Sequence, residues 1–201
     1  MHIVCLDLEG VLVPEIWIEF SRRTGIAELS RTTRDEPDYD KLMRRRLALL
    51  DEHHLGLPDI QAVIAAMSPF PGARAFLDSL REQCQVVILS DTYYQFAAPL
   101  MQQLGQPTLF CHELAVEAGG RVRDYRLRMP DQKRASVRAF RSLNFLTIAA
   151  GDSYNDTGML AEAHAGILYR PPDKVVTEFP QYPVTRDYAQ LRAAIESARN
   201  V

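Results

Sequence analysis

The stretch VCLDLEGVLVPE, residues 4–15, joins a strand-like apolar run to two acidic side chains, Asp7 and Glu9, and then to a second apolar run. A carboxylate that leaves water is strongly disfavoured unless a cation or several hydrogen-bond donors compensate it. We therefore expect a positively charged partner close to Asp7 and Glu9.

Composition limits the partners of the chain. Its 201 residues are 47% hydrophobic and carry a formal net charge of −3, which favours one large domain or a core with an inserted cap. A slightly acidic chain has no overall basic field for nucleic acid or anionic lipid, so we predict small-molecule substrates, no nucleic acid and no membrane as partners. Nothing in the sequence indicates an oligomeric state.

The cellular location is predicted from two further features. No apolar run approaches the roughly 20 residues that cross a bilayer, and the first ten residues lack the features of a signal peptide. The three cysteines form no CxxC pair, which suits a reducing compartment. We predict a cytoplasmic protein with free thiols.

The apolar pattern predicts an α/β fold. Short apolar runs indicate buried strands at residues 3–8, 86–89, 108–111, 146–150 and 166–169. Helical patterns lie between most of them, at residues 72–83, 94–104, 131–143 and 155–163. This alternation favours a parallel sheet covered on both faces, which binds ligands beyond the carboxyl ends of its strands. Residues 118–129 alternate around Gly119 and Gly120 and predict a hairpin.

The region after the first strand breaks the alternation. Only helical patterns occur there, at residues 15–24, 39–53 and 58–67. We predict a small helical cap at residues 14–68, inserted after the first strand and placed over Asp7. Residues 1–13 and 69–201 would form the core.

Four short motifs fall at predicted strand or helix ends: DLEG (7–10), ILSD (88–91), DQK (131–133) and AGDSYND (150–156). Each alone is as easily a turn or a helix cap. Together and in this order they resemble the four motifs of the haloacid dehalogenase superfamily of phosphotransferases. The resemblance implies a Rossmann-like core, a Mg²⁺ ion and an aspartyl-phosphate intermediate on Asp7.

Physical chemistry supports the same assignment. A carboxylate that attacks a phosphate ester meets like-charge repulsion, which a divalent cation and a positive side chain remove. Asp7 and Asp152, at neighbouring strand ends, could both hold Mg²⁺, which prefers oxygen ligands. Lys133 would sit at a helix N-terminus, where the helix dipole disfavours a cation, so a functional reason is favoured over a solvated lysine.

The remaining motif residues have two interpretations each. Asp156 could hold the outer shell of the metal or cap the helix, and Asn155 could donate to a phosphoryl oxygen or complete a turn. Ser90 offers a hydroxyl and a nearby N–H to the phosphoryl oxygens. Glu9 would be the general acid and then the general base, and its carbonyl could bind the metal, although an exposed turn glutamate is the alternative.

The predicted cap contains a sign of the substrate. In DKLMRRRLALL (40–50), helical periodicity places Arg46 in the middle of an apolar face, while Arg44 and Arg45 point elsewhere. A guanidinium stays charged, so Arg46 needs an acidic partner, and a ligand carboxylate would serve. Glu15 could accept a ligand ammonium, pair with Arg46, or be an ordinary first-turn glutamate. If Arg46 binds a ligand carboxylate and Glu15 a ligand ammonium, the ligand is an α-amino acid phosphate, of which phosphoserine is the simplest.

A closer resemblance points the same way. The helical cap resembles the phosphoserine phosphatase branch, although that branch usually has Asp-x-Asp-x-Thr/Ser, Ser-Gly-Gly and GDGAND where this chain has DLEGV (7–11), SDT (90–92) and GDSYND (151–156). These departures are similar to a bifunctional group that hydrolyses L-phosphoserine and transfers its phosphoryl group to L-homoserine. The likeness is carried by CLDLEGVLVPEIWI (5–18), TTRDEPDYDKLM (32–43), VVILSDTYY (86–94), AAGDSYNDTGML (149–160) and EAHAGIL (162–168).

That resemblance implies roles for single residues. Asp7 would be the nucleophile and Glu9 the proton donor, and the metal ligands would be Asp7, Glu9 and Asp152. The substrate contacts would be Glu15, Arg46, Ser90, Asp91, Lys133 and Asn155. The alternatives are a phosphatase of the same fold for another phosphate monoester, a receiver-like phosphorylation switch, and a catalytically silent sensor. The insert after the first strand argues against a receiver, and the intact Asp7 argues against a silent sensor.

Overall fold

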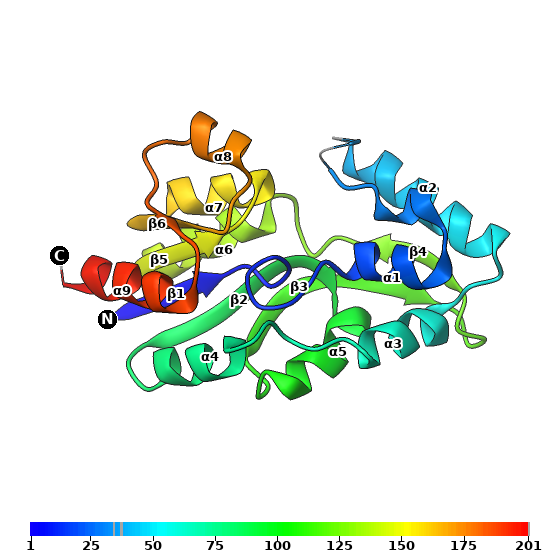
Figure 1. Ribbon diagram of the computed structural model, residues 1–201, viewed down its shortest axis with the longest axis horizontal. Coiled ribbons are helices and arrows are strands. Elements are labelled where there is room, and N and C mark those ends of the chain that lie inside the picture. Colours follow the sequence, from blue (N-terminus) through cyan, green and yellow to red (C-terminus); the bar gives the residue numbers. More distant parts are fainter. Residues whose placement is uncertain (34, 37, 201) are drawn as a thin grey trace.

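A seven-stranded sheet forms the centre of the molecule in the computed structural model, which describes residues 1–33, 35–36 and 38–200 (Figure 1). The strand order is β4-β3-β2-β1-β5-β6-β7. Neighbouring strands are parallel except β4, which runs antiparallel to β3. The bounds are β1 His2–Leu6, β2 Gln85–Tyr93, β3 Thr108–Val116, β4 Val122–Arg126, β5 Leu146–Gly151, β6 Ala165–Tyr169 and β7 Val184–Thr185. The predicted α/β class is confirmed.

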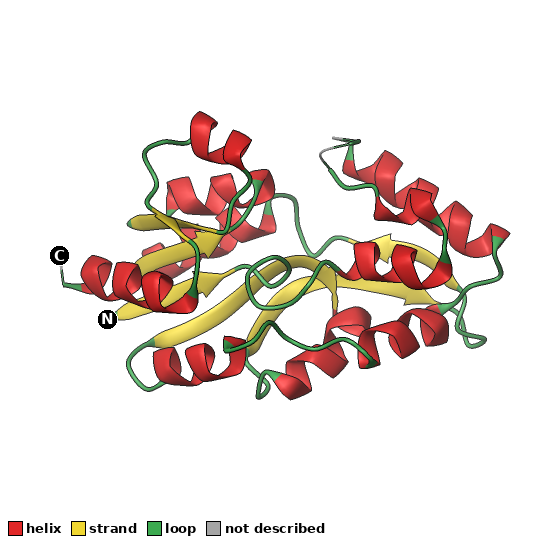
Figure 2. Cartoon of the chain, in the orientation of Figure 1, coloured by secondary structure: helices red, strands yellow, loops and turns green. Residues whose placement is uncertain are grey.

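Helices cover both faces of this sheet (Figure 2). One face holds α4 (Ala73–Arg81), α5 (Tyr94–Gln103) and α9 (Tyr188–Arg199), and the other holds α6 (Gln132–Ser142), α7 (Thr157–Glu162) and α8 (Asp173–Glu178). Side chains of β1 alternate between the two layers: Val4 and Leu6 join the first, Ile3 and Cys5 the second. Burial on both faces explains why β1 is apolar throughout.

The segment between β1 and α4, here called the insert, is helical. It contains α1 (Ile16–Thr24), a short 3₁₀ helix η1 (Ala27–Ser30), α2 (Tyr39–Glu52) and α3 (Leu57–Ala65). Residues 34 and 37 of the predicted cap lie outside the described residues. Apolar side chains of the insert, among them Trp17, Phe20, Met43 and Ile60, belong to the same buried cluster as the core helices α4, α5 and α9. The insert therefore packs directly on the core.

The hairpin differs from its prediction. Its turn lies at Gly119 and Gly120, but its arms are β3 and β4, so β3 continues beyond the predicted end at residue 111. The hairpin packs against α2, where Arg121 pairs with Asp51 at 2.7 Å and Arg44 with Asp124 at 2.8 Å. Polar alternation marked the strand β4, but the pattern did not show that β3 continues to Val116 to pair with it.

Two other elements also differ. β2 does not end at residue 89 but continues to Tyr93, with a register shift between Leu89 and Tyr93. Such a bulge turns side chains away from the regular directions of a strand. The irregular segment contains Ser90 and Asp91. The helix predicted at 155–163 is divided into a 3₁₀ turn, η2 (Tyr154–Asp156), and α7. No element after residue 169 was predicted, yet α8, β7 and α9 complete the sheet and its cover.

Two smaller predictions concern cysteines and membrane spans. Cys5, Cys84 and Cys111 are free thiols, as expected, and Cys5 and Cys111 are buried. Within the described ranges, no helix combines the length and the apolar character needed to cross a bilayer.

Candidate active site

The loop after β1 brings Asp7 to the carboxyl edge of the sheet. Asp7 is 4% exposed, its N–H donates to the carbonyl of Ala150 at 3.0 Å, and its Oδ1 accepts the N–H of Leu8 at 2.7 Å. Gly10 in the same loop has φ +80°, and a Cβ there would lie 2.6 Å from the carboxylate of Asp152. Glycine at position 10 therefore allows Asp152 to approach Asp7.

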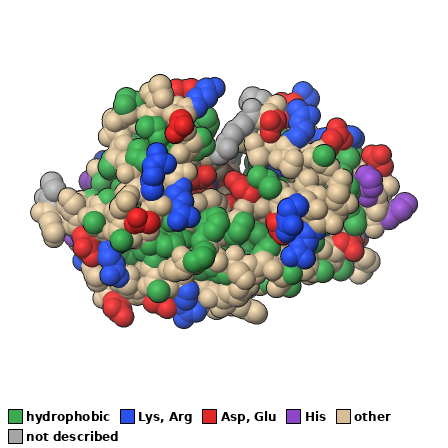
Figure 3. Space-filling view, in the orientation of Figure 1, with side chains coloured by type: hydrophobic (Ala, Val, Ile, Leu, Met, Phe, Trp, Pro, Cys, Tyr) green, Lys and Arg blue, Asp and Glu red, His purple; other side chains and the backbone are tan. Residues whose placement is uncertain are grey.

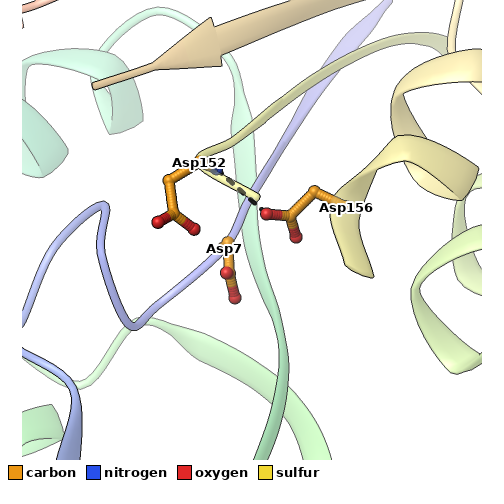
Figure 4. Close-up of side chains that lie close together, drawn as sticks. All are labelled: Asp7, Asp152 and Asp156. Atoms are coloured by element: carbon orange, nitrogen blue, oxygen red, sulfur yellow. Dashed lines mark hydrogen bonds between the residues drawn. The ribbon is translucent and has the colours of Figure 1, made fainter. Parts of the chain in front are cut away.

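Three carboxylates converge at this edge. Figure 4 shows that the side chains of Asp7, Asp152 and Asp156 lie close together and that Asp156 is directed toward the loop of Asp152. Each offers one oxygen, and these oxygens lie within 4.8 Å of one another. Oδ2 of Asp156 accepts the N–H groups of Asp152 at 2.9 Å and Ser153 at 3.1 Å. Asp156 thus holds the loop that carries Asp152, within the capping box of η2 that it forms with Ser153.

Lys133 supplies the expected positive partner for Asp7. It lies in the first turn of α6 and is 2% exposed. Its Nζ is 2.9 Å from Oδ1 of Asp7, 2.8 Å from Oδ1 of Asp156 and 3.7 Å from Oδ2 of Asp91. Burial favours the neutral amine, but the three carboxylates outweigh it and raise the pKa of Lys133 well above its usual value.

The carboxylates still outnumber the cation. Burial and the charge of Asp156 raise the pKa of Asp7 well above its usual value, against the opposing effect of Lys133. Burial, with the charges of Asp156 and Glu15, raises the pKa of Asp152 to about 7. Converging buried oxygens with this excess of negative charge are the ligands that Mg²⁺ prefers, so the residues present fit a divalent cation.

Ser90, Asp91 and Asn155 form the side of the site next to Lys133. Ser90 is buried and Asp91 partly exposed, and Nδ2 of Asn155 donates to Oδ2 of Asp91 at 3.1 Å. Burial alone would raise the pKa of Asp91, but Lys133, His112 and hydrogen bonds including that from Asn155 hold it well below its usual value. Asp91 is therefore an ionised group that organises its neighbours.

Glu9 lies in the same loop but outside the group of three carboxylates. Its Oε2 accepts the N–H of Ile16 at 2.9 Å, at the start of α1. This bond ties the loop after β1 to the first helix of the insert. The side chain still lines the pocket described below.

Arg46 faces the site from the insert. It is 7% exposed, while Arg44 and Arg45 are exposed, so the predicted face of α2 is confirmed. Its guanidinium lies 4.6 Å from the ring centre of Trp17, and its Nη2 donates to the carbonyl of Arg31 at 2.6 Å. Among residues 1–33, 35–36 and 38–200 no carboxylate forms an ion pair with Arg46, and its buried Nε has no hydrogen-bond partner.

A pocket of about 340 Å³ joins these groups. Figure 3 shows a notch with acidic side chains between the two halves of the molecule. Asp156 is fully buried and does not line the pocket. The lining includes every other predicted site residue: Asp7, Glu9, Glu15, Arg46, Ser90, Asp91, Lys133, Asp152 and Asn155.

The structure also adds residues that the sequence did not indicate. Trp17, Tyr39 and Arg170 line the pocket, and Tyr39 shares a 2.7 Å hydroxyl contact with Tyr93 of β2. His112 and Gln132 lie behind Asp91. Gln132 stands beside Lys133 in the motif DQK, which could have drawn attention to it. His112 had no such signal, because it joins the site through the pairing of β3 with β2.

The chain is similar to several known proteins. The chain is 61% identical to phosphoserine phosphatase ThrH of Pseudomonas aeruginosa over 96% of this chain and 94% of that protein. It is 58% identical to a phosphoserine phosphatase of Pseudomonas syringae pv. tomato, over 100% of this chain and 84% of that protein. A substrate-bound phosphoserine phosphatase complex has the same fold, with a TM-score of 0.79, 20% identity and coverage of 98% of this chain and 97% of that one.

A family model covers most of the sequence. The model of haloacid dehalogenase-like hydrolases matches residues 1–164, a range that includes the loop after β1, the insert, the bulge of β2, Lys133 and the three converging carboxylates. The architecture and the family match lead to one conclusion: the chain belongs to the haloacid dehalogenase-like hydrolases.

Proposed function

We propose that this protein is a Mg²⁺-dependent phosphoserine phosphatase that also transfers the phosphoryl group of L-phosphoserine to L-homoserine. The names of two relatives at 61% and 58% identity support the substrate of the hydrolysis. The charge pattern of the pocket supports it independently. Asp7 and Lys133 lie at one end, suited to a phosphoryl group, and Arg46 and Glu15 lie in the wall formed by the insert.

The buried guanidinium of Arg46 is the observation that carries the substrate assignment. No carboxylate of the described residues pairs with it, and it faces a pocket that also contains Asp7. A substrate carboxylate would satisfy this charge through two parallel hydrogen bonds. Glu15, at the start of α1, would accept the ammonium group. A phosphorylated sugar would leave the guanidinium of Arg46 without a matching charge.

The reaction begins at Asp7. Its carboxylate oxygen attacks phosphorus, a new O–P bond forms, and the bond from phosphorus to the serine oxygen breaks. Lys133 holds Asp7 and offers positive charge to the phosphoryl oxygens, and Ser90 and Asn155 donate to the same oxygens. Asp7, Asp152 and the backbone carbonyl of Glu9 would hold Mg²⁺, with Asp156 in its outer shell. The bound cation supplies charge neutralisation.

Glu9 would carry the proton in both half-reactions. Its Oε2 is held by the N–H of Ile16, which leaves Oε1 to protonate the departing serine oxygen. In the second half-reaction the same oxygen takes a proton from the acceptor, which then attacks the phosphorus. The aspartyl-phosphate breaks at its O–P bond and Asp7 is restored.

The acceptor decides between the two activities. Water gives phosphate, and the hydroxyl of homoserine gives O-phosphohomoserine. Homoserine differs from serine by one methylene, and a pocket discriminates on one methylene by only about 1–3 kcal/mol. Arg46 and Glu15 would hold the amino acid end of either compound. A cytoplasmic location, predicted from the sequence, would supply both amino acids.

A timed reaction tests both halves of the proposal. The purified protein is given Mg²⁺ and L-phosphoserine, with and without L-homoserine, and serine, phosphate and O-phosphohomoserine are quantified. We expect serine release in both reactions and, with homoserine, serine in excess of phosphate by the amount of phosphohomoserine. Equal serine and phosphate in both reactions would contradict the transfer. No serine release would contradict the phosphatase assignment.

A further inference from the structure

The carboxylate of Asp91 is surrounded by donors on both of its oxygens. Oδ2 accepts from Nδ2 of Asn155 at 3.1 Å and lies 3.7 Å from Nζ of Lys133. Oδ1 accepts from Nε2 of Gln132 at 3.3 Å and lies 3.6 Å from Nε2 of His112. One oxygen therefore faces two groups of the pocket, and the other faces two buried side chains that do not line it.

The ring of His112 has a defined tautomer. Its Nδ1 accepts the backbone N–H of Arg128 at 3.1 Å. In a neutral imidazole the accepting nitrogen has no proton, so the proton lies on Nε2, which is the nitrogen that faces Asp91. His112 is 4% exposed, and its Cα pairs with Tyr93 at the end of the bulge that carries Asp91.

The amide of Gln132 is also oriented from behind. Its Oε1 accepts from Nη2 of Arg128 at 2.7 Å, which leaves Nε2 to donate to Asp91 and, at 2.9 Å, to the carbonyl of Ser90. Exchange of the two ends of the amide would place its oxygen against two acceptors. Arg128 therefore fixes Gln132 through its side chain and His112 through its backbone.

We propose that His112 and Gln132 are positioning residues that act through Asp91 to hold Asn155 and Lys133 in place for phosphoryl transfer. The assignment rests on the proposed function, because it takes Asn155 and Lys133 as the groups that meet the phosphoryl oxygens. An ionised Asp91 with both oxygens occupied cannot rotate without losing contacts to the pocket. Loss of the rear donors should therefore change the rate of reaction more than the stability of the fold.

Two substitutions of His112 separate the two nitrogens. In His112→Gln the side-chain amide reaches the place of Nε2 and keeps a donor for Asp91. In His112→Asn it ends near the place of Nδ1 and loses that donor. We expect kcat to fall about tenfold or more in His112→Asn and to stay within about threefold of the wild type in His112→Gln. The melting temperatures of the two variants should agree within about 3 °C.

The coupling through Asp91 is tested in a second background. If His112 acts through Asp91, His112→Asn should lower kcat by less than about twofold when Asp91→Asn is already present. The proposal would be overturned if kcat fell equally in His112→Gln and His112→Asn. It would also be overturned if His112→Asn lowered kcat as much in the Asp91→Asn background as in the wild type. If His112→Asn does not fold, Gln132→Met is compared with and without Asp91→Asn by the same criterion.

The substrates keep this test apart from the test of the proposed function. All rates are measured with L-phosphoserine and with p-nitrophenyl phosphate, which has no amino acid end. A wild type that hydrolyses only p-nitrophenyl phosphate contradicts the proposed substrate but leaves the comparison of the His112 variants intact. Unchanged kcat of His112→Asn on every ester that the wild type hydrolyses contradicts the positioning role alone.

Discussion

Each end of the pocket contains a buried cation, but only one of the two cations is paired with carboxylates of the described residues. Lys133, at the phosphoryl end, lies 2.9 Å from Asp7 and 2.8 Å from Asp156. Arg46, at the end formed by the insert, contacts the carbonyl of Arg31 and the ring of Trp17 but, in the described part of the chain, forms no ion pair with a carboxylate. One cation is neutralised by the protein, and the other is the one that we propose to bind an acidic ligand.

This difference separates a structural cation from a binding cation. Removal of one partner of a buried ion pair leaves an uncompensated charge, which strongly destabilises a fold. An unpaired buried cation already carries that cost, so its removal costs the fold little and costs ligand binding much. The predictions below test this distinction, from the largest expected effect to the smallest.

The nucleophile should show the largest effect. Asp7→Asn replaces a carboxylate with an amide that cannot form the phosphorylated intermediate, so we predict that kcat on phosphoserine falls by at least about 10⁴-fold. Steady-state release of serine measures the loss, and acid quenching with labelled substrate measures bound phosphate. Labelled phosphate bound to Asp7→Asn at the wild-type level would show that another residue is the nucleophile.

Lys133 should matter to stability as well as to activity. Lys133→Met leaves Asp7 and Asp156 without their cation, and we predict a loss of about 3–5 kcal/mol in the free energy of unfolding at pH 7. The pKa of Asp7 is already raised in the folded state, so its protonation relieves the variant as the pH falls and the loss should shrink toward pH 5. Denaturant unfolding at both pH values measures this.

The matched control for Lys133 is Lys174→Met. Lys174 is exposed and 3.9 Å from Glu178. An exposed pair of this kind contributes less than about 1 kcal/mol, so the control should unfold like the wild type. If the two variants were equally stable, the buried cation would not hold the phosphoryl end together.

Arg46 should behave in the reverse way. Arg46→Met removes an unpaired buried charge, so we predict wild-type stability within about 1 kcal/mol but a KM for phosphoserine raised about 100-fold. Arg45→Met is the control, because Arg45 points away from the pocket and pairs with Glu28 at the surface. Arg45→Met should leave KM unchanged. A strongly destabilised Arg46→Met with normal KM would make Arg46 a structural residue.

The affinity for Mg²⁺ should depend on pH to a smaller degree. In the metal-free protein the pKa of Asp152 is raised to about 7 and that of Asp7 is raised well above its usual value, so a cation must displace protons below neutral pH. We predict binding about tenfold weaker at pH 6 than at pH 8, measured by calorimetry. The same affinity at both pH values would show that these carboxylates are already ionised.

The sequence predicted those parts of the site that depend on local patterns. Asp7, Ser90 and Asp152 follow apolar runs, and helical periodicity alone placed Arg46 on the buried face of α2. Lys133 was expected from its conflict with the helix dipole. These signals lie within a few residues of each side chain.

The parts that were missed depend on the pairing of one strand with another, which the apolar pattern of a single segment does not show. The extension of β2 to Tyr93 follows from a bulge against β3, and the arms of the hairpin follow from the pairing of β3 with β4. His112 reaches Asp91 only through the first of these pairings. The side chain of Glu9 lies outside the group of three carboxylates, and its Oε2 accepts the N–H of Ile16, a contact that spacing from Asp7 does not reveal.

The most direct test of the account compares two substrates that differ by one carboxylate. The kcat/KM values for L-phosphoserine and O-phosphoethanolamine are measured for the wild type and for Arg46→Met. If Arg46 binds the substrate carboxylate, kcat/KM of the wild type should be about 100-fold higher for phosphoserine than for phosphoethanolamine. In Arg46→Met the two kcat/KM values should differ by only a few-fold. Equal kcat/KM for the two substrates in the wild type, or a full preference that persists in Arg46→Met, would contradict the account.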